Sequence, residues 1–316
     1  MLNVYYTLSK QRNKKHPENQ DRIDVSIEYL KKNLPQNINI FSNKDSLKHL
    51  QETFSTAPIN KAKLLLTQVY SNDYLDSIES ICDELEDDNI REGDTYFSTV
   101  TYKEVVNNSY ILYDVCYQIV EEFAKYAYCL IRPPSHHAKL NKYNGFCIVN
   151  HTFVIAKYLN INHDKRICIL DYDVHHGDGT QELVKAHTKD DVYFCSMHCF
   201  APGFFPGTGS EEENSERVLN VPFQKHTKDD EYIKKFDSVV CPFIEKANPD
   251  IIIISNGLDA HIDDTFKVMD LTSKFYIHVT KYLKSLDKSL IYILEGGYNP
   301  EVIGNISKDI ITTIVA

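Results

Sequence analysis

The chain has 316 residues, of which 42% are hydrophobic, so it is long enough to bury a sizeable core and is not a disordered polymer. Its formal net charge is −11, and an acidic surface argues against nucleic acid or an anionic membrane as the main partner. The eight cysteines form no C-x-x-C pair and several lie in apolar runs, which indicates a reducing compartment and not a disulfide framework.

The N-terminal segment MLNVYYTLSK lacks the basic start and the long apolar core of a signal peptide. No apolar run approaches the roughly 20 residues needed to span a bilayer. We therefore expect a cytoplasmic enzyme, with a nuclear or host-cell destination as the alternatives. The first half of the chain predicts strands at 2–7 and 64–70 and helices at 20–32, 71–85 and 101–127. The acidic segment 83–94 is typical of a solvated loop.

Strand-like and helical segments alternate in the second half of the chain. A strand is predicted at 128–131, a helix at 147–159, and further strands at 167–174, 192–198, 251–255 and 290–295. Most of these strands are continuously apolar, which is typical of strands covered on both faces. The pattern predicts an α/β sandwich around a parallel sheet. With no internal repeat and no linker, residues 1–316 are predicted to form a single domain.

Each chemically suggestive group follows the C-terminal end of one of these strands. The segments RPPSHH, DYDVHHGD, SMHCF, SNGLDAH and EGGYN occupy these positions in turn. In an open parallel sheet, ligands bind in the crevice outside the carboxyl ends of the strands. We therefore expect these five loops to converge on one site.

Two carboxylates and an imidazole at the end of the strand at 167–174 point to a divalent metal. Asp171, Asp173 and His175 alternate along the chain, so they share one face of an extended strand. The favoured ligands are Asp173, His175 and Asp259, because oxygen and imidazole donors suit zinc and three protein ligands leave a position for water and substrate. The alternative is a strand-end turn at Asp173 and His175 with Asp259 as a helix cap.

A metal-dependent hydrolase also needs groups that take up and deliver protons. His136 and His137 follow a proline-rich turn, and Asp171 and Asp178 are candidates to orient the two imidazoles.

Tyr298 follows two glycines, where its hydroxyl can donate to an oxyanion; the alternative is a surface tyrosine in a glycine turn. Two aromatic loop segments, Gly145-Phe146 and Gly203-Phe204-Phe205, are expected either to bury an apolar part of the ligand or to pack as a lid.

Taken together, the motifs resemble the zinc-dependent histone deacetylase family, which includes bacterial histone deacetylase-like amidohydrolases and acetylpolyamine amidohydrolases. The segments that carry the resemblance are RPPSHHA, GFC, DYDVHHGDGTQE, SMHCFAPGFFPGTG, SNGLDAH and LEGGYN, within a match from about His16 to Tyr298. The LEGGYN and DAH forms are closer to the class II and bacterial branches. The resemblance implies an arginase/deacetylase-like three-layer α/β sandwich with a mostly parallel central sheet.

The resemblance also implies roles for the site residues. Zn²⁺ would be held by Asp173, His175 and Asp259. His137 would act as general base and then acid beside His136, oriented by Asp171 and Asp178, and Tyr298 would polarise the scissile carbonyl. A K⁺ or Na⁺ ion would lie near Asp171, Asp173, His175, Ser196 and Met197, partly through main-chain oxygens. The acylated side chain would be contacted by Gly145, Phe146, Phe205, Phe266 and, at the rim, Asp94.

Three departures from the family pattern stand out. Ser135 replaces the usual glycine before the histidine pair, Val149-Asn150-His151 replaces an aromatic-Asn-Asn run, and Thr265-Phe266 replaces Pro-Leu at the tunnel mouth. The polyamine-selective branch has an acidic gate near Phe266; Phe266 is not acidic, but Asp263 and Asp264 lie close to it in the sequence.

We therefore expect removal of acetyl or other acyl groups from lysine in proteins by attack of metal-activated water, with inhibition by hydroxamates. The alternative in the same family is an acetylpolyamine deacetylase. A two-metal ureohydrolase-type enzyme and a non-catalytic acyl-lysine binding module are the further alternatives, and iron can occupy the same ligands as zinc.

Overall fold

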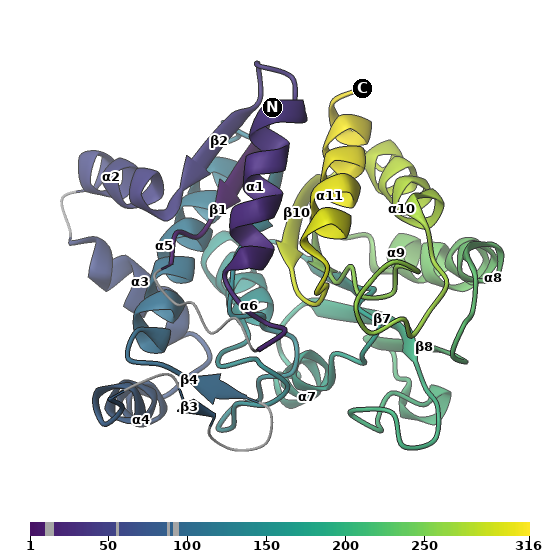
Figure 1. Cartoon of the computed structure of the whole chain (residues 1–316), viewed down its shortest axis with the longest axis horizontal. Helices are drawn as coiled ribbons and strands as arrows, with labels where there is room; N and C mark the ends of the chain where they lie inside the picture. Colours follow the sequence, from purple (N-terminus) through teal and green to yellow (C-terminus); the bar gives the residue numbers. More distant parts are fainter. Residues whose placement is uncertain (10–15, 55–56, 87–88, 91–94) are drawn as a thin grey trace.

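The computed structural model describes residues 1–9, 16–54, 57–86, 89–90 and 95–316. An eight-stranded sheet runs through its centre in the order β2-β1-β5-β10-β9-β6-β7-β8, and every neighbouring pair is parallel (Figure 1). Its strands are β1 (Leu2–Tyr6), β2 (Asn39–Ser42), β5 (Tyr126–Leu130), β6 (Ile167–Asp171), β7 (Val192–Cys199), β8 (Val218–Phe223), β9 (Ile251–Asn256) and β10 (Ser289–Leu294). A short antiparallel pair, β3 (Asn89–Ile90) and β4 (Tyr96–Phe97), forms a second sheet.

Helices cover both faces of the central sheet. One layer contains α1 (Asp21–Asn33), α8 (Asp229–Lys235), α9 (Cys241–Ala247), α10 (Ser273–Ser285) and α11 (Pro300–Val315), with α1 and α11 side by side in Figure 1. The other layer contains α2 (Asn43–Thr53), α3 (Pro58–Leu66), α4 (Asn72–Asp83), α5 (Thr101–Val120), α6 (His151–His163) and α7 (Asp178–Ala186). A 3₁₀ turn, η1 (Glu211–Glu213), precedes β8, and a π-helical turn, η2 (Phe236–Val240), joins α8 to α9.

The central strands are apolar throughout because each face of the sheet has its own core. In β9, Ile252 and Ile254 pack into the core under α1 and α11, while Ile251 and Ile253 pack into the core under α5 and α6. Side chains alternate between the two faces of a strand, so a strand buried on both faces has no polar side. The predicted parallel sheet and three-layer α/β architecture are confirmed.

The strand predicted at 64–70 is wrong. Residues 64–66 form the end of the helix α3. The first residue of this helix is Pro58, and proline is favoured in the first helical turn. Ala62, Leu65 and Leu66 are buried at helical spacing, whereas Leu64 is 40% exposed. Because a short apolar run fits a strand or a buried helix equally well, packing against α5 decides the outcome.

Two helices differ from prediction at one end. The helix predicted to reach Ala127 stops at Val120, because Glu122 adopts a positive φ of 60° and the chain then enters β5. The helix predicted from Cys147 begins at His151, where the side chain of Asn150 accepts a hydrogen bond from the backbone N–H of Phe153. The helix predicted at 71–85 is confirmed as α4 with Ser71 as its N-cap.

Both edge strands of the sheet were missed in the sequence. The four residues of β2 and the segment VLNVPF of β8 are short, and they mix polar and apolar side chains. Pro222 is tolerated in β8 because an edge strand has backbone N–H groups that need no partner strand. All eight cysteines are buried and unpaired. No helix in the described ranges is long and apolar enough to cross a membrane.

Candidate active site

The loops that leave β5, β6, β7, β9 and β10 meet at the carboxyl edge of the sheet. β6 pairs with β7 and with β9, so Asp171 at its end lies opposite Ser196 on one side and Ser255 on the other. The edge of the sheet therefore brings together acidic, hydroxyl and imidazole groups that are far apart in the chain.

Each imidazole of the histidine pair faces a buried carboxylate. Nδ1 of His136 lies 2.9 Å from Oδ2 of Asp171, and Nδ1 of His137 lies 2.7 Å from Oδ1 of Asp178. The two rings are 4.0 Å apart, and both histidines are 3% exposed. A carboxylate at Nδ1 leaves Nε2 of each ring available for other partners and fixes the orientation of the ring.

Asp173, His175 and Asp259 place three potential metal ligands within 4.8 Å of one another. Nδ1 of His175 lies 3.0 Å from Oδ1 of Asp173 and 3.2 Å from Oδ2 of Asp259. Both carboxylates are fully buried, whereas the side chain of His175 is 17% exposed.

Two observations show that this set fits a cation. Within the ranges that the structure describes, Oδ2 of Asp259 accepts no hydrogen bond, although it is buried. Gly296 lets two carboxylate oxygens lie close to the backbone, because a Cβ at this position would clash with Oδ2 of Asp259 at 2.3 Å and with Oδ2 of Asp173 at 2.5 Å. Two carboxylates and one imidazole brought together in this way match a zinc site with an open coordination position.

The pKa values of Asp259 and His175 are also those of a site that stabilises positive charge. Burial and the nearby Asp173 raise the pKa of Asp259 to about 6. Burial opposes protonation of His175, but its contacts with Asp173 and Asp259 raise its pKa to about 9. In the absence of a cation, protons on these groups offset the clustered negative charge.

The two histidines of the pair have opposite shifts. Burial disfavours the charged form of His136, but Asp173 and Asp171 raise its pKa well above the ordinary value. Burial, together with the charge of His136, lowers the pKa of His137 to about 4, although Asp178 opposes the shift. One imidazole is therefore held as a cation while its neighbour is held neutral and able to accept a proton.

A second group of potential ligands contains His136, Cys147 and Glu295, whose ligand atoms also lie within 4.8 Å of one another. The carboxylate of Glu295 already accepts hydrogen bonds from hydroxyl and backbone donors of Ser135, His136, Thr152 and Ser255. These donors use its lone pairs, so this group is a hydrogen-bonded cluster and a poor metal site.

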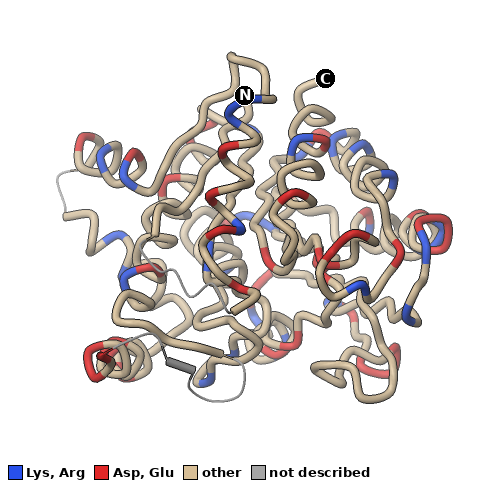
Figure 2. The backbone as a smooth tube through the Cα atoms, in the orientation of Figure 1, with Lys and Arg blue, Asp and Glu red and all other residues tan. Residues whose placement is uncertain are grey.

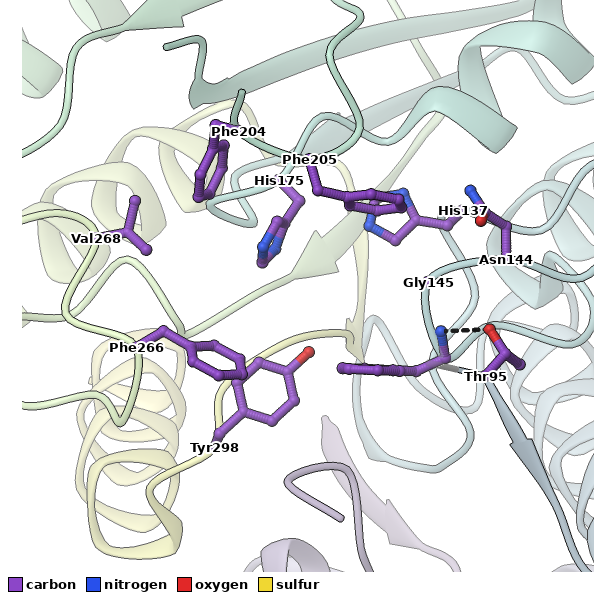
Figure 3. Close-up of a pocket in the computed structure, with 11 residues that line it drawn as sticks. Thr95, His137, Asn144, Gly145, His175, Phe204, Phe205, Phe266, Val268 and Tyr298 are labelled. Atoms are coloured by element: carbon purple, nitrogen blue, oxygen red, sulfur yellow. Dashed lines mark hydrogen bonds between the residues drawn. The ribbon is translucent and has the colours of Figure 1, made fainter. Parts of the chain in front are cut away.

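A cavity of about 460 Å³ reaches His137 and His175. Figure 3 shows the residues that line it. Phe204 and Phe205 lie on one side of it, and Phe266 and Tyr298 lie side by side on the other, with ring centroids 4.7 Å apart. The predicted residues Gly145, Phe146, Phe205, Phe266 and Tyr298 all line this cavity, together with His137 and His175. Asp94 lies outside the described residues.

Three further lining residues were not singled out in the sequence: Thr95, Asn144 and Val268. Phe204, from the predicted aromatic segment 203–205, also lines the cavity. Phe204 stacks on His175, with ring centroids 5.1 Å apart and an interplanar angle of 6°. The hydroxyl of Thr95 accepts a hydrogen bond of 3.1 Å from the backbone N–H of Phe146 (Figure 3). No motif in the sequence distinguishes Thr95, Asn144 or Val268.

Tyr298 is held through its backbone by Asp264. The fully buried Asp264 carboxylate accepts hydrogen bonds from the N–H groups of Phe266, Tyr298 and Asn299 at 2.7–3.1 Å. Arg22 approaches the Tyr298 ring to 5.0 Å. Asp264 therefore stabilises the loop and does not face the cavity as an acidic gate.

Residues 16–314 match the model of the histone deacetylase domain. The chain belongs to the histone deacetylase family. Histone deacetylase HDA1 of Saccharomyces cerevisiae is 31% identical over 317 residues, covering 95% of this chain and 44% of the relative. Histone deacetylase 15 of Arabidopsis thaliana is 32% identical over 253 residues, covering 77% of this chain and 45% of the relative. The chain therefore spans less than half the length of these two relatives.

Solved histone deacetylase-fold structures superimpose on nearly the whole chain. The crystal structure of the HDA15 HD domain has a TM-score of 0.84 and 26% identity, covering 99% of this chain and 88% of that one. Acetylpolyamine aminohydrolase from Burkholderia pseudomallei has a TM-score of 0.81 and covers 100% of this chain and 99% of that one; at 20% identity it supports the fold alone. The expected family and arginase/deacetylase-like fold are confirmed.

Proposed function

We propose that this chain is a zinc-dependent deacetylase that removes acetyl groups from lysine side chains of proteins, with residues 1–316 as one catalytic domain. The observation that carries the proposal is the cavity that leads to Asp173, His175, Asp259 and His137. A cavity lined by aromatic rings that reaches a potential metal site and a neutral imidazole suits a linear amide on an aliphatic stem.

Asp173, His175 and Asp259 would hold the zinc ion. When bound there, zinc supplies Lewis-acid polarisation of the substrate carbonyl and lowers the pKa of a water molecule. Two features support this assignment over a hydrogen-bonded cluster: two carboxylate oxygens approach each other at Gly296, and within the described residues the buried Oδ2 of Asp259 accepts no hydrogen bond.

His137 is positioned to move the protons of the reaction. Its low pKa keeps it neutral near pH 7, so Nε2 can take a proton from the attacking water and deliver it to the leaving amine. Asp178 fixes the ring through Nδ1. His136, paired with Asp171, supplies a fixed positive charge beside the reacting groups.

The hydroxyl of Tyr298 would donate a hydrogen bond to the oxyanion that forms on the substrate carbonyl. Burial and the nearby Asp259 raise the pKa of Tyr298 well above its ordinary value, so the hydroxyl keeps its proton. A neutral donor held at a fixed place stabilises the developing negative charge without reorganisation.

The lining of the cavity favours acyl-lysine over acetylpolyamine. None of the described lining residues is an aspartate or glutamate, and the rings of Phe146, Phe205 and Phe266 offer apolar contact. A lysine stem carries no charge between its amide and the peptide, whereas an acetylpolyamine carries an ammonium group that would need an acidic partner. The polyamine reaction, which the sequence motifs leave open as the alternative within the family, is the second candidate.

A monovalent cation is a further part of the proposal. Asp171, Ser196 and Met197 are fully buried beside one another at the ends of β6 and β7. Their oxygen atoms, with main-chain oxygens of Asp173 and His175, would hold K⁺ or Na⁺ behind the zinc ligands.

The test compares kcat/KM for an acetyl-lysine peptide, a longer-acyl peptide and N-acetylputrescine, using protein shown to contain one zinc per chain. We expect the acetyl-lysine peptide to react at least tenfold faster than the polyamine and a hydroxamate to inhibit. Faster turnover of N-acetylputrescine would establish the polyamine reaction instead. Zero turnover of every substrate with zinc bound would leave a binding module, and two Mn²⁺ per chain would indicate a ureohydrolase-type centre.

A further inference from the structure

Glu295, at the end of β10, is a fully buried carboxylate that the proposed chemistry does not use. Oε2 accepts hydrogen bonds from the backbone N–H groups of Ser135 and His136 at 2.5 and 3.1 Å. Oε1 accepts from the hydroxyls of Ser135, Thr152 and Ser255 at 2.5, 3.1 and 3.3 Å. Five donors from three separate segments therefore converge on one side chain.

Two of these donors are the backbone N–H groups of Ser135, which precedes the histidine pair, and of His136, its first member. The N–H of His136 points to Glu295, and the carbonyl oxygen of His136 accepts a hydrogen bond of 3.1 Å from the N–H of Thr180. The backbone of His136 is thus held from both sides, while Asp171 holds its ring. Because His137 is the next residue, the same contacts fix the position of the backbone from which both imidazole side chains extend.

The side chain of Ser135 strengthens this attachment. Its hydroxyl bonds to Oε1 of Glu295 and lies 3.0 Å from the hydroxyl of Thr152. The glycine that is usual at this position in the family pattern would supply the backbone N–H but no hydroxyl. The serine is 1% exposed, so water cannot replace the lost donor without entering the core.

Glu295 also connects the histidine pair to the other side of the site. Its carbonyl oxygen accepts a hydrogen bond of 2.5 Å from Arg22, and the N–H of Gly296 donates to Oδ2 of Asp173 at 2.7 Å. Tyr298 lies two residues after Gly296. The side chain of Glu295 therefore holds the histidine pair, while the backbone of the same short segment holds the proposed metal ligand Asp173 and leads to Tyr298.

We propose that Glu295 is a positioning residue for the histidine pair and that Ser135 acts with it through its hydroxyl. This inference rests on the proposed deacetylase function. Neither side chain touches the cavity, so both act by holding the backbone at His136.

The test uses Glu295→Gln in the zinc-loaded protein. The amide keeps the size of the side chain but places an N–H₂ group among five donors. We expect kcat for an acetyl-lysine peptide to fall at least 30-fold with KM changed less than threefold. In protein labelled with ¹⁵N-histidine, we expect the downfield Nδ1–H signals of His136 and His137 to shift or disappear.

The matched control is Ser307→Ala, which removes a buried hydroxyl bonded to Tyr128 away from the site. It should lower the melting temperature while leaving kcat and the histidine signals unchanged. Unchanged histidine signals and a kcat within threefold of wild type in Glu295→Gln would overturn the proposal. The histidine signals need no turnover, so they test Glu295 even if the wild-type chain hydrolyses no acyl substrate and the proposed function fails.

Ser135→Gly provides a second test if Glu295→Gln does not fold. It restores the usual family residue and removes one donor only. We expect a three- to tenfold fall in kcat, unchanged KM and a shift of the His136 signal. If Ser135→Gly matches wild type in kcat and in both signals, the serine has no positioning role and the proposal fails.

Discussion

Residues outside the lining of the cavity hold several residues of the candidate site in position. Asp264 holds the backbone of Tyr298, Asp178 holds the ring of His137, and Gly296 holds a carboxylate oxygen of Asp173. Each of these contacts joins segments at least 34 residues apart in the chain. The chemistry of single residues in this protein therefore depends on partners from other loops.

Removal of the Tyr298 hydroxyl tests the proposed oxyanion donor. We expect Tyr298→Phe to lower kcat by about 10²–10³-fold, which is the usual effect of losing one such donor, with little change in KM. Steady-state kinetics and zinc analysis provide the measurement. Tyr282→Phe is the control, because its hydroxyl bonds to Cys241 and Glu245 on the outer helices. Equal kcat values for Tyr298→Phe and wild type would rule out the role.

At the scale of elements, α3 shows how packing decides between a helix and a strand. Leu65 and Leu66 are fully buried against α5, while the adjacent Leu64 is 40% exposed. We expect Leu65→Ala and Leu66→Ala each to lower the free energy of unfolding by about 2–5 kcal/mol. Leu64→Ala should change it by about 0.5 kcal/mol or less.

Urea unfolding of the three variants provides the measurement. A strand would place Leu64 and Leu66 on one face, so similar losses at 64 and 66 with none at 65 would contradict the helix.

The start of α6 carries a buried histidine that makes the fold sensitive to acid. His151 is 1% exposed, its Nε2 lies 3.2 Å from the carbonyl oxygen of Val105, and burial lowers its pKa to about 4. The unfolded chain titrates near 6.5, so it binds more protons than the folded chain between these values. This residue therefore lowers stability as pH falls from about 6.5 to 4, by up to about 3 kcal/mol.

His151→Gln should flatten the acid side of the stability curve, because the amide keeps a donor near Val105 and does not titrate. Melting temperatures measured between pH 4 and 7 test this. The exposed His226→Gln serves as control and should follow the wild-type curve. A parallel acid loss in His151→Gln and wild type would show that other groups account for it.

At the scale of the whole molecule, a bound cation should link the site to global stability. Asp171, Asp173 and Asp259 are all fully buried, so removal of a cation leaves their charges poorly compensated. We expect chelation of the metal to abolish turnover and to lower the melting temperature. Zinc added at 100 times its Kd should raise the free energy of unfolding of the metal-free protein by about 2.7 kcal/mol.

Asp259→Asn should lose this response, since the amide removes one ligand charge while keeping the shape of the side chain. Scanning calorimetry with and without added zinc provides the measurement. A melting temperature of wild-type protein that does not respond to zinc would contradict the assignment of these ligands.

Continuous apolar runs made much of the fold predictable. The strands at 167–171, 192–199, 251–256 and 289–294 need no polar face because helices cover both sides of the sheet. The edge strands β2 and β8 were not predictable, since half-exposed strands mix polar and apolar residues in no clear alternation. The LLL run of α3 was misassigned because its local pattern fits either structure.

By itself, the sequence determined which chemical groups follow the strands and therefore meet at one edge of the sheet. It predicted Asp173, His175 and Asp259 as a donor set and His136 and His137 as a pair, and it identified the family to which the chain belongs. Only the tertiary structure decided that Phe204 stacks on His175, that Asp264 faces the backbone, and that Glu295 holds a turn 160 residues earlier in the chain. Such contacts depend on which loops become neighbours in the fold and on the direction in which each side chain points. The spacing of residues along one segment contains no information on either.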